Sequence, residues 1–393
     1  MKKSFKCTVA PLRPRFQRGL SLIELMVAMV IGLVVSLAIF SVMSVSEARK
    51  RNTTGTNDMN QNGAFALYQL DQAIRSAGTG FSQQYTLTFG CAINAKNSGK
   101  AVIPPASLPS PFSSLTANIG GAFRMAPVII SQDPNGKLSD TLIVMAGSAG
   151  YGEMPIESTS VPTTSPSALH LLNTLSFSAG QQLLVAERPG DSTGSLSPCL
   201  VESVDNTYAG SASTGVLPLG GKFYTAGTDK TLASYSSNSV ALNLGFNPSF
   251  QLYGVGSNDA LVAFDLLNGT AADADLIADG VVEMHAIYGV DNANNGTIAW
   301  TAPTGSYAAS ALLDGSVDAG KRIAAIKAIR IGLITRSAVE DKNVVLSGTT
   351  TLPAMFEGTA FSRAKTLNEA EQKFRYRVLD ATIPLRNALV VSN

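Results

Sequence analysis

The sequence predicts an α+β fold, in which a long N-terminal helix packs on a mainly antiparallel β-sheet head. Three observations support this prediction. An apolar stretch follows a basic leader, an apolar stripe with helical spacing comes next, and the rest alternates short β-prone runs with clusters of turn-forming residues. The chain has 393 residues, 45% of them hydrophobic, which is enough for a large core.

Residues 1–19 form a basic leader. They hold six of the 29 Lys and Arg residues and neither Asp nor Glu. The rest of the chain keeps 23 basic and 28 acidic residues, so its net charge is about −5. A protein that binds nucleic acid carries a clustered basic face. The composition therefore argues against a nucleic-acid partner and predicts a soluble head outside the cytoplasm.

Residues 20–46 are predicted to form one transmembrane helix. Between Glu24 and Glu47 lie 22 uncharged, mostly apolar residues. As a helix they would extend about 33 Å, which is enough for a hydrocarbon core of about 30 Å. The six positive charges before the segment outnumber the three that follow it, so the C-terminal part is predicted to face outward.

Glu24 is the most informative single residue of this segment. An ordinary secretory signal is cleaved after its apolar region, whereas the Gly19 boundary precedes it here. An ionisable residue in an apolar span is costly and is taken as functional by default. Its natural partner is a new α-amino group at Leu20, on the same chain or on a neighbour. The alternative is an uncleaved signal anchor in which Glu24 occurs by chance.

The run from Arg18 to Leu25, RGLSLIEL, resembles the class III signal of type IV prepilins and type II secretion pseudopilins. That signal is a basic leader ending in Gly, then a hydrophobic residue, with Glu as the fifth mature residue. The resemblance implies cleavage between Gly19 and Leu20 by the prepilin peptidase, and N-methylation of Leu20 by the same enzyme. It also implies that Glu24 guides subunit docking by pairing with a neighbour's N-terminus.

Residues 47–78 are predicted to continue the helix outside the membrane. Residues 52–57 are weak helix formers, which predicts a loosened or interrupted helix there. Gly78-Thr79-Gly80 is the predicted stop. Apolar residues at spacings of three and four form a stripe that would pack the helix against the head. These residues are Met59, Gly63, Ala66, Leu67, Leu70 and Ile74.

Residues 61–67, QNGAFAL, followed by Arg75, Ala77 and Gly78, resemble the PilW subfamily of minor pilins. Four segments of the C-terminal third stand in that family's order: 280–284, 288–291, 329–337 and 386–387. The resemblance covers the first 80 residues and roughly 280–390. It implies a pilin-type fold with a β-rich head at 79–393.

As a PilW-like protein, the chain would be a minor pilin that enters the type IV pilus and helps prime its assembly, at or near the tip. It would lie in the bacterial inner membrane with a periplasmic head and then in the pilus fibre at the cell surface. The implied partners are other minor and major pilins, the inner-membrane assembly platform, the prepilin peptidase and a tip adhesin. A J-type pseudopilin of a type II secretion system is the alternative.

The head is predicted to consist of short strands and long loops. Strands are predicted at 128–131, 141–145, 181–186, 239–244, 284–288, 297–301, 324–335 and 374–378. Residues 146–168 and 190–238 are rich in Ser, Thr and Gly and are predicted to be surface loops or irregular insertions.

Cys91 and Cys199 would be the only cysteines of the cleaved chain, because Cys7 lies in the leader. An even pair in an exported chain predicts a disulfide. It would close a loop of about 108 residues and contribute roughly 4–5 kcal/mol in the chain-entropy model. The alternative is two unrelated buried thiols.

Two patterns that could carry chemistry are weak. Residues 190–194 match Gly-x-Ser-x-Gly, but no helix signal follows Ser192, and a nucleophile elbow needs a strand–turn–helix context. Of the two histidines, His170 precedes Ser192, whereas His285 follows it and is predicted to be half-buried or exposed on a strand. Residues 291–296 resemble a calcium loop, but Ala293 offers no side-chain ligand, so a plain hairpin turn is predicted.

The sequence therefore predicts a structural subunit. It predicts no enzymatic activity, no metal site and no cofactor. A membrane-anchored exported enzyme or a sugar-binding adhesin is the alternative from another class. Either would need a catalytic or ligand-binding constellation of side chains, and the sequence patterns do not indicate one.

Overall fold

The computed structural model describes residues 19, 21–133, 139–149, 154–159, 167–187, 196–210, 215–224, 235, 238–269, 274–341, 344–346 and 350–389. The chain divides into an N-terminal unit, Met1–Thr54, and a C-terminal unit, Gly55–Asn393. The C-terminal unit includes the predicted head at 79–393. Three sequence predictions lie outside the described residues: the leader at 1–18, Leu20 and the 190–194 pattern.

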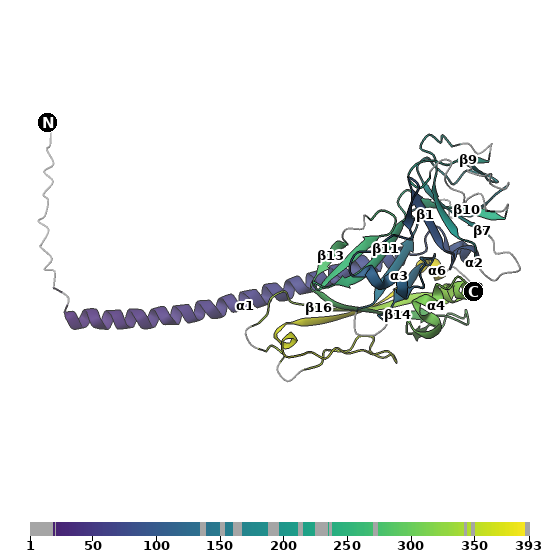
Figure 1. Ribbon diagram of the computed structural model, residues 1–393. Coiled ribbons are helices and arrows are strands. Elements are labelled where there is room, and N and C mark those ends of the chain that lie inside the picture. Colours follow the sequence, from purple (N-terminus) through teal and green to yellow (C-terminus); the bar gives the residue numbers. More distant parts are fainter. Residues whose placement is uncertain are drawn as a thin grey trace, which may run out of the picture. The chain divides into compact units, whose positions relative to one another are not determined.

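Helix α1, Leu22–Ser76, contributes residues to both units (Figure 1). The predicted interruption at 52–57 is wrong, because the helix is continuous there. The Thr53 hydroxyl donates to the Arg49 carbonyl at 3.0 Å, so its hydrogen bonding stays within the helix. The helix ends before Gly78, as predicted, and Gly78 has a φ of +83°, which glycine adopts readily.

The last part of α1 belongs to the C-terminal unit and packs within it through the predicted stripe, of which Leu67 is only half-buried. Its buried residues are Met59, Gly63, Ala66, Leu70 and Ile74. Gly63 allows a close approach to two strands. A Cβ at that position would lie 2.8 Å from Leu379 Cδ1 and 3.1 Å from Thr335 Cγ2, so a larger side chain would push the helix away.

The described residues of the C-terminal unit form four sheets. A six-stranded sheet has the order β2-β1-β8-β7-β10-β5. Its strands are β1 (Ile93–Asn97), β2 (Lys100–Ile103), β5 (Ile156–Glu157), β7 (Gln182–Glu187), β8 (Cys199–Ser203) and β10 (Ser239–Gly245). A two-stranded sheet joins β6 (Ala168–His170) to β9 (Val216–Pro218). Strand β9 lies at the end of the unit near β1 and β10 (Figure 1).

A five-stranded sheet has the order β13-β12-β11-β4-β3. Its strands are β3 (Val128–Ser131), β4 (Thr141–Ala146), β11 (Ser249–Gly256), β12 (Ala260–Asp265) and β13 (Asp275–Asp279). The fourth sheet, β15-β14-β16-β17, consists of β14 (Val281–Val290), β15 (Ala299–Thr301), β16 (Ile326–Arg336) and β17 (Tyr376–Pro384). Strands β1 and β8 pair in parallel and the other pairs are antiparallel, so the predicted α+β, mainly antiparallel fold class is confirmed.

Short helices connect the strands. They are α2 (Tyr85–Thr88), α3 (Leu115–Asn118), α4 (Ala309–Leu312), α5 (Val317–Ala325) and α6 (Arg386–Leu389). Helix α5 is capped by the Ser316 hydroxyl, which accepts a hydrogen bond from the Ala319 N–H at 3.1 Å. The predicted strand at 324–335 is therefore wrong at its start, because Ala324 and Ala325 end α5 and the strand begins at Ile326.

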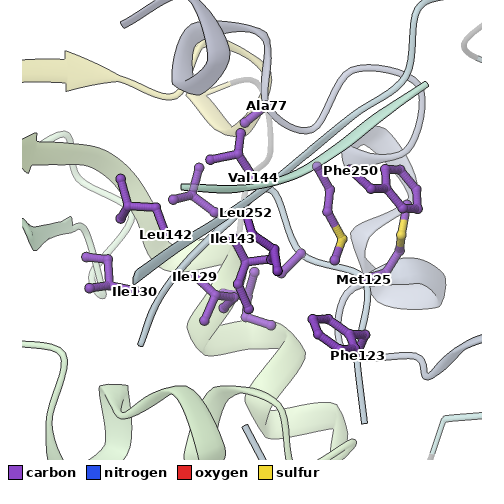
Figure 2. Packing of buried hydrophobic residues seen from close by; sticks show 14 of the residues in the cluster. Ala77, Phe123, Met125, Ile129, Ile130, Leu142, Ile143, Val144, Phe250 and Leu252 are labelled. Carbon is purple, nitrogen blue, oxygen red and sulfur yellow. The ribbon is translucent and has the colours of Figure 1, made fainter. Parts of the chain in front are cut away.

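The main hydrophobic core joins the buried stripe of α1 to the sheets. Figure 2 shows its centre, where side chains of β3, β4 and β11 gather with Phe123 and Met125. A smaller core lies under β6 and β9, and a third lies beside β14 and β16. Burial of this apolar surface is the main term that stabilises the unit.

The predicted strands at 128–131, 141–145, 181–186 and 239–244 are confirmed within a residue or two. The loop predictions are partly wrong, because β5 and β6 lie within or across 146–168 and β8 and β9 lie within 190–238. All five residues of β8 are buried. The sequence did not predict this short central strand because the surrounding segment is rich in Ser, Thr and Gly.

Asn387 connects the end of the chain to the end of α1. Its Nδ2 atom donates to the Ala77 carbonyl at 3.0 Å and the Ser76 carbonyl at 3.3 Å, and it lies 2.9 Å from Thr79 Oγ1. The last carbonyls of a helix lack partners within the helix. Asn387 therefore supplies a C-terminal cap for α1 from a residue more than 300 positions away.

Candidate assembly site: the N-terminal helix and the buried anchors of the C-terminal unit

The predicted processing and docking residues lie at the start of α1. Glu24 is in the first turn of the helix, where a negative charge interacts favourably with the helix dipole. Gly19 is exposed and has no neighbouring atom within 4 Å of a Cβ built on it. Leu20 lies outside the described residues. Cleavage after Gly19 and pairing of Glu24 with a neighbour's N-terminus stay predictions.

The segment after Glu24 presents apolar side chains on all sides. The exposed fraction of its large hydrophobic residues ranges from 47% at Leu25 to 70% at Phe40. Its most apolar 18-residue stretch has a mean hydropathy of 2.8 and none of it is buried. By length and composition, α1 is a helix that could cross a membrane, and it is the one helix of this kind among the described residues.

The polar groups of this segment are satisfied within the helix. The Ser36 hydroxyl donates to the Gly32 carbonyl, and the Ser41 hydroxyl donates to the Ala38 carbonyl, each at 2.8 Å. Such internal hydrogen bonds suit a helix in hydrocarbon, where unpaired donors are costly. The single carboxylate of Glu24 is the group that still requires a partner in a low-dielectric setting.

The predicted disulfide between Cys91 and Cys199 is confirmed. The two Cα atoms are 5.6 Å apart, an ordinary separation for a disulfide, and both residues are fully buried. Cys91 precedes β1, and Cys199 begins β8 opposite Ile93. The bond therefore fixes the one parallel strand pair of the six-stranded sheet, whose partners are far apart in the sequence.

His285 is buried, so its predicted half-buried or exposed position is wrong. It lies on β14, where its Nδ1 is 3.4 Å from Asp140 and its Nε2 is 3.4 Å from Glu283. Glu283 also pairs with Lys365 at 2.7 Å. The residues join the start of β4, strand β14 and the segment before β17. Their sequence separation explains why sequence patterns did not reveal the cluster.

The charged groups of this cluster shift one another's pKa values toward the charged forms. Burial lowers the pKa of His285, but the neighbouring carboxylates of Asp140 and Glu283 raise it more, so the net shift is upward, against a smaller opposing effect of Arg363. Burial raises the pKa of Glu283, but His285 and Lys365 lower it to about 2. The cluster therefore favours a charged imidazolium between two carboxylates and holds three segments together.

The Asp291 turn is a capped loop. The Asp291 carboxylate accepts hydrogen bonds from the Asn295 N–H at 3.1 Å and the Gly296 N–H at 2.7 Å. Burial raises its pKa, but these backbone hydrogen bonds lower it overall. Its oxygens hold the connection between β14 and β15. Across the described residues, no group of three or more His, Cys, Asp or Glu residues is placed to hold a metal ion.

The candidate hydrolase residues are not brought together among the described residues. His170 is exposed at the end of β6. His285 is buried on β14 and contacts carboxylates. Ser192 lies outside the described residues. The arrangement that the structure does describe has the chemistry of structural ion pairs.

Two family models match the chain. Residues 14–45 match the prokaryotic N-terminal methylation motif, which includes Gly19, Leu20 and Glu24. Residues 252–387 match the model described as type IV pilus-assembly protein W, PilW. The second match begins within β11 and ends at Asn387, in α6.

A methylation motif that leads into a long apolar helix, followed by a mainly antiparallel β unit, defines the chain as a type IV pilin-like protein. Within that class, residues 252–387 match the PilW family of type IV pilus-assembly proteins. The predicted family is thus confirmed. The matches start earlier in the C-terminal part than predicted, at 252, and neither includes the PilW-like segment at 61–67.

A type IV-like pilin from Thermus thermophilus is among the similar solved structures. It shares 12% sequence identity, and the alignment covers 54% of this chain and 87% of that chain with a TM-score of 0.17. A TM-score this low supports no argument about the arrangement of the elements. The curated proteins include no significant match to the sequence.

Proposed function

We propose that the chain is a minor pilin that is incorporated into the type IV pilus and helps prime its assembly, at or near the tip. The prepilin peptidase would cleave between Gly19 and Leu20 and methylate Leu20. The methylation motif at 14–45, which includes the start of an unburied apolar helix, is the observation that carries this proposal. Such a surface needs a membrane or other apolar helices around it.

Glu24 would act when the subunit leaves the membrane and joins the filament. Its carboxylate would pair with the N-terminal amino group of a neighbouring subunit, since an unpaired charge in a low-dielectric core is strongly unfavourable. The apolar side chains from Leu25 onward would pack against neighbouring helices. The C-terminal unit would then select neighbours by shape.

The family and the fold belong to structural pilus proteins, which assemble with other pilins in the pilus. We propose a structural, non-enzymatic role for this chain as well. Before assembly, the apolar helix would anchor it in the bacterial inner membrane with the C-terminal unit in the periplasm. Its specific partners would be the inner-membrane assembly platform and, at the tip, a large adhesin.

Intact mass and N-terminal sequencing test the proposal. The protein is isolated from its native host and from the same host without prepilin peptidase. A mature chain that begins at methylated Leu20, found only with the peptidase, is the expected result. A chain that keeps residues 1–19, or one cut after the apolar segment, would contradict the proposal.

The type II secretion pseudopilin is the competing assignment, because the methylation motif is common to both systems. The PilW match over 252–387 favours the pilus. Sheared pili probed with an antibody against the C-terminal unit distinguish the two. The chain is expected in the pilus fraction, whereas its absence there together with loss of secretion in a deletion strain would assign it to the secretion system.

A further inference from the structure

The outer edge of β17 is an open strand edge. Among the described strands, β17 pairs with β16 alone and ends the order β15-β14-β16-β17. With nine residues it is the longest strand at a sheet edge in the part of the chain that the structure describes. A free edge presents unpaired N–H and C=O groups that can accept a further strand.

The direction of these groups follows from the hydrogen bonds that flank the strand. The Ser337 N–H donates to the Arg375 carbonyl and the Leu385 N–H donates to the Lys327 carbonyl, each at 2.9 Å. The register between β16 and β17 has no shift, so odd-numbered residues of β17 face β16. Residues 376, 378, 380 and 382 therefore direct their N–H and C=O groups outward.

The exposure of Asp380 agrees with this direction. Asp380 as a whole is exposed, whereas only 23% of its side-chain surface is accessible. Its main-chain atoms therefore provide the exposed surface. Each face of the strand contacts another part of the unit, since Leu379 packs near Gly63 of α1 on one side and the Phe356 N–H donates to the Asp380 carboxylate at 2.8 Å on the other.

The other edges among the described strands are protected in the ways that natural proteins use. Strands β2 and β13 are short and each has a register shift. Strands β5 and β15 have two and three residues. Strand β3 is fully buried, and its Ile130 N–H donates to the Tyr288 hydroxyl at 2.6 Å. Strand β17 is long and regular, with its single proline at the end.

The charges along β17 indicate what kind of segment fits. Arg377 is exposed, donates to Asn60 at 2.7 Å, and forms no ion pair with a described residue. The one carboxylate of the strand, Asp380, is already held by Arg330 through contacts of 2.9 and 2.7 Å. The edge is therefore net positive at Arg377, and a carboxylate opposite this residue would be favourable.

We propose that the outer edge of β17 binds an extended, carboxylate-bearing segment of a neighbouring pilin-like subunit, which adds to the sheet as a further strand. Main-chain hydrogen bonds would give the affinity, and the charge at Arg377 would help to choose the register. The inference rests on the proposed function and specifies one of its contacts. It is distinct from the contact made by the apolar helix.

Site-specific photo-crosslinking in pilus-producing cells tests this contact. A photoreactive amino acid is placed at Thr382, which is exposed on the edge, and as controls at Val30 in the apolar helix and at Leu172, exposed beyond β6. The expected result is an adduct at Thr382 with another pilin-like subunit, mapped by mass spectrometry to an extended segment that contains Asp or Glu. Arg377→Glu should reduce its yield at least about fivefold, whereas Arg377→Lys should retain it.

A backbone variant gives a second test. Thr382→Pro removes an outward N–H and leaves the bonds between β16 and β17 intact, whereas Thr382→Val keeps the N–H. The amount of the chain in sheared pili should fall at least about tenfold for Thr382→Pro and stay unchanged for Thr382→Val. The free energy of unfolding of each variant, measured in denaturant, shows whether it is folded.

Three results would overturn the inference. They are an adduct at Val30 without one at Thr382, a Thr382 adduct that maps to a helix, and equal pilus levels of Thr382→Pro and Thr382→Val. In these cases the proposed function stands if the chain is processed at Leu20. A chain that keeps residues 1–19 and gives no adduct at Val30 contradicts the proposed function, and the inference falls with it.

Discussion

The first and last parts of helix α1 carry similar apolar residues but use them in opposite ways. In the N-terminal unit these residues are exposed on every side of the helix, with Phe40 at 70%. In the C-terminal unit, Leu70 and Ile74 are fully buried beneath the sheets. The first part therefore has an exposed apolar surface that is available to a membrane or to other helices. The apolar surface of the last part is already buried and stabilises the fold of the unit.

The strongest test of this contrast is Glu24→Gln. The substitution keeps the size of the side chain and removes its charge, so a neighbour's N-terminal amino group would lose its partner in the filament core. Breaking a buried ion pair costs about 3–5 kcal/mol, which corresponds to a fall of more than about 100-fold in incorporation. Immunoblots of sheared pili measure this, with the membrane fraction as the reference.

Ser21→Ala is the matched control, since it changes an exposed neighbour of Glu24 without altering charge. Processing at Leu20 is expected in both variants, so the defect should appear only at assembly. Normal pilus levels of Glu24→Gln would show that the carboxylate has no role in docking.

In the C-terminal unit the largest single effect is expected from Cys199→Ser. The bond closes a long loop and is fully buried, so its loss should lower the free energy of unfolding by about 2–5 kcal/mol. Denaturant unfolding of the full chain in detergent measures this. Cys7→Ser is the control and should leave the stability unchanged, and an equal loss in both variants would contradict the structural role of the disulfide.

The buried His285 cluster predicts a smaller, pH-dependent effect. The pKa of His285 is raised in the folded state, so its contribution is fully present below the unfolded pKa of about 6.5 and is lost as the pH rises through the folded value. The pKa of Glu283 is lowered to about 2, so its contribution is present above about 4.5 and is lost as the pH falls toward 2.

The measurement is the difference in unfolding free energy between the wild-type chain and His285→Gln as a function of pH. The difference should be largest between about pH 4.5 and 6.5 and shrink at higher pH. Lys365, Arg363 and Glu371 also face the cluster and are unchanged in this pair. His170→Gln, which changes the exposed histidine, is the control. A difference independent of pH would mean that His285 acts through packing alone.

The N-terminal unit could be predicted from the sequence because its properties are local. A charge-free run, a Gly boundary and Glu24 are sufficient to indicate the helix and its class. The interruption predicted at 52–57 was wrong because intrinsic propensity is a weak guide within a long helix. The docking role of Glu24 cannot be tested within a single chain and stays a prediction.

The C-terminal unit was predicted less completely because its contacts are long-range. Strands with clear apolar runs, such as β3 and β4, were predicted correctly, and the disulfide followed from the number of cysteines. Strand β8 was missed because its burial comes from pairing with β1 and β7, which are far away in the sequence. The Ser-, Thr- and Gly-rich residues on either side of it gave no local sign of a buried strand. The His285 cluster was missed for the same reason, since Asp140 and Lys365 are far from it in sequence.

The smallest predicted effect concerns the C-terminal end of α1. Asn387 donates to carbonyls at the end of the helix, and Asn387→Ala would remove these bonds, although the Ser76 carbonyl would keep its hydrogen bonds from Thr79. A net loss of about 1 kcal/mol in unfolding free energy is expected, the usual contribution of a neutral hydrogen bond. Arg386→Ala, at the exposed neighbouring position, is the control. Because the cap stabilises only the buried part of α1, pilus incorporation of Asn387→Ala should stay close to normal. A large assembly defect with unchanged stability would mean that this end of the helix also takes part in docking.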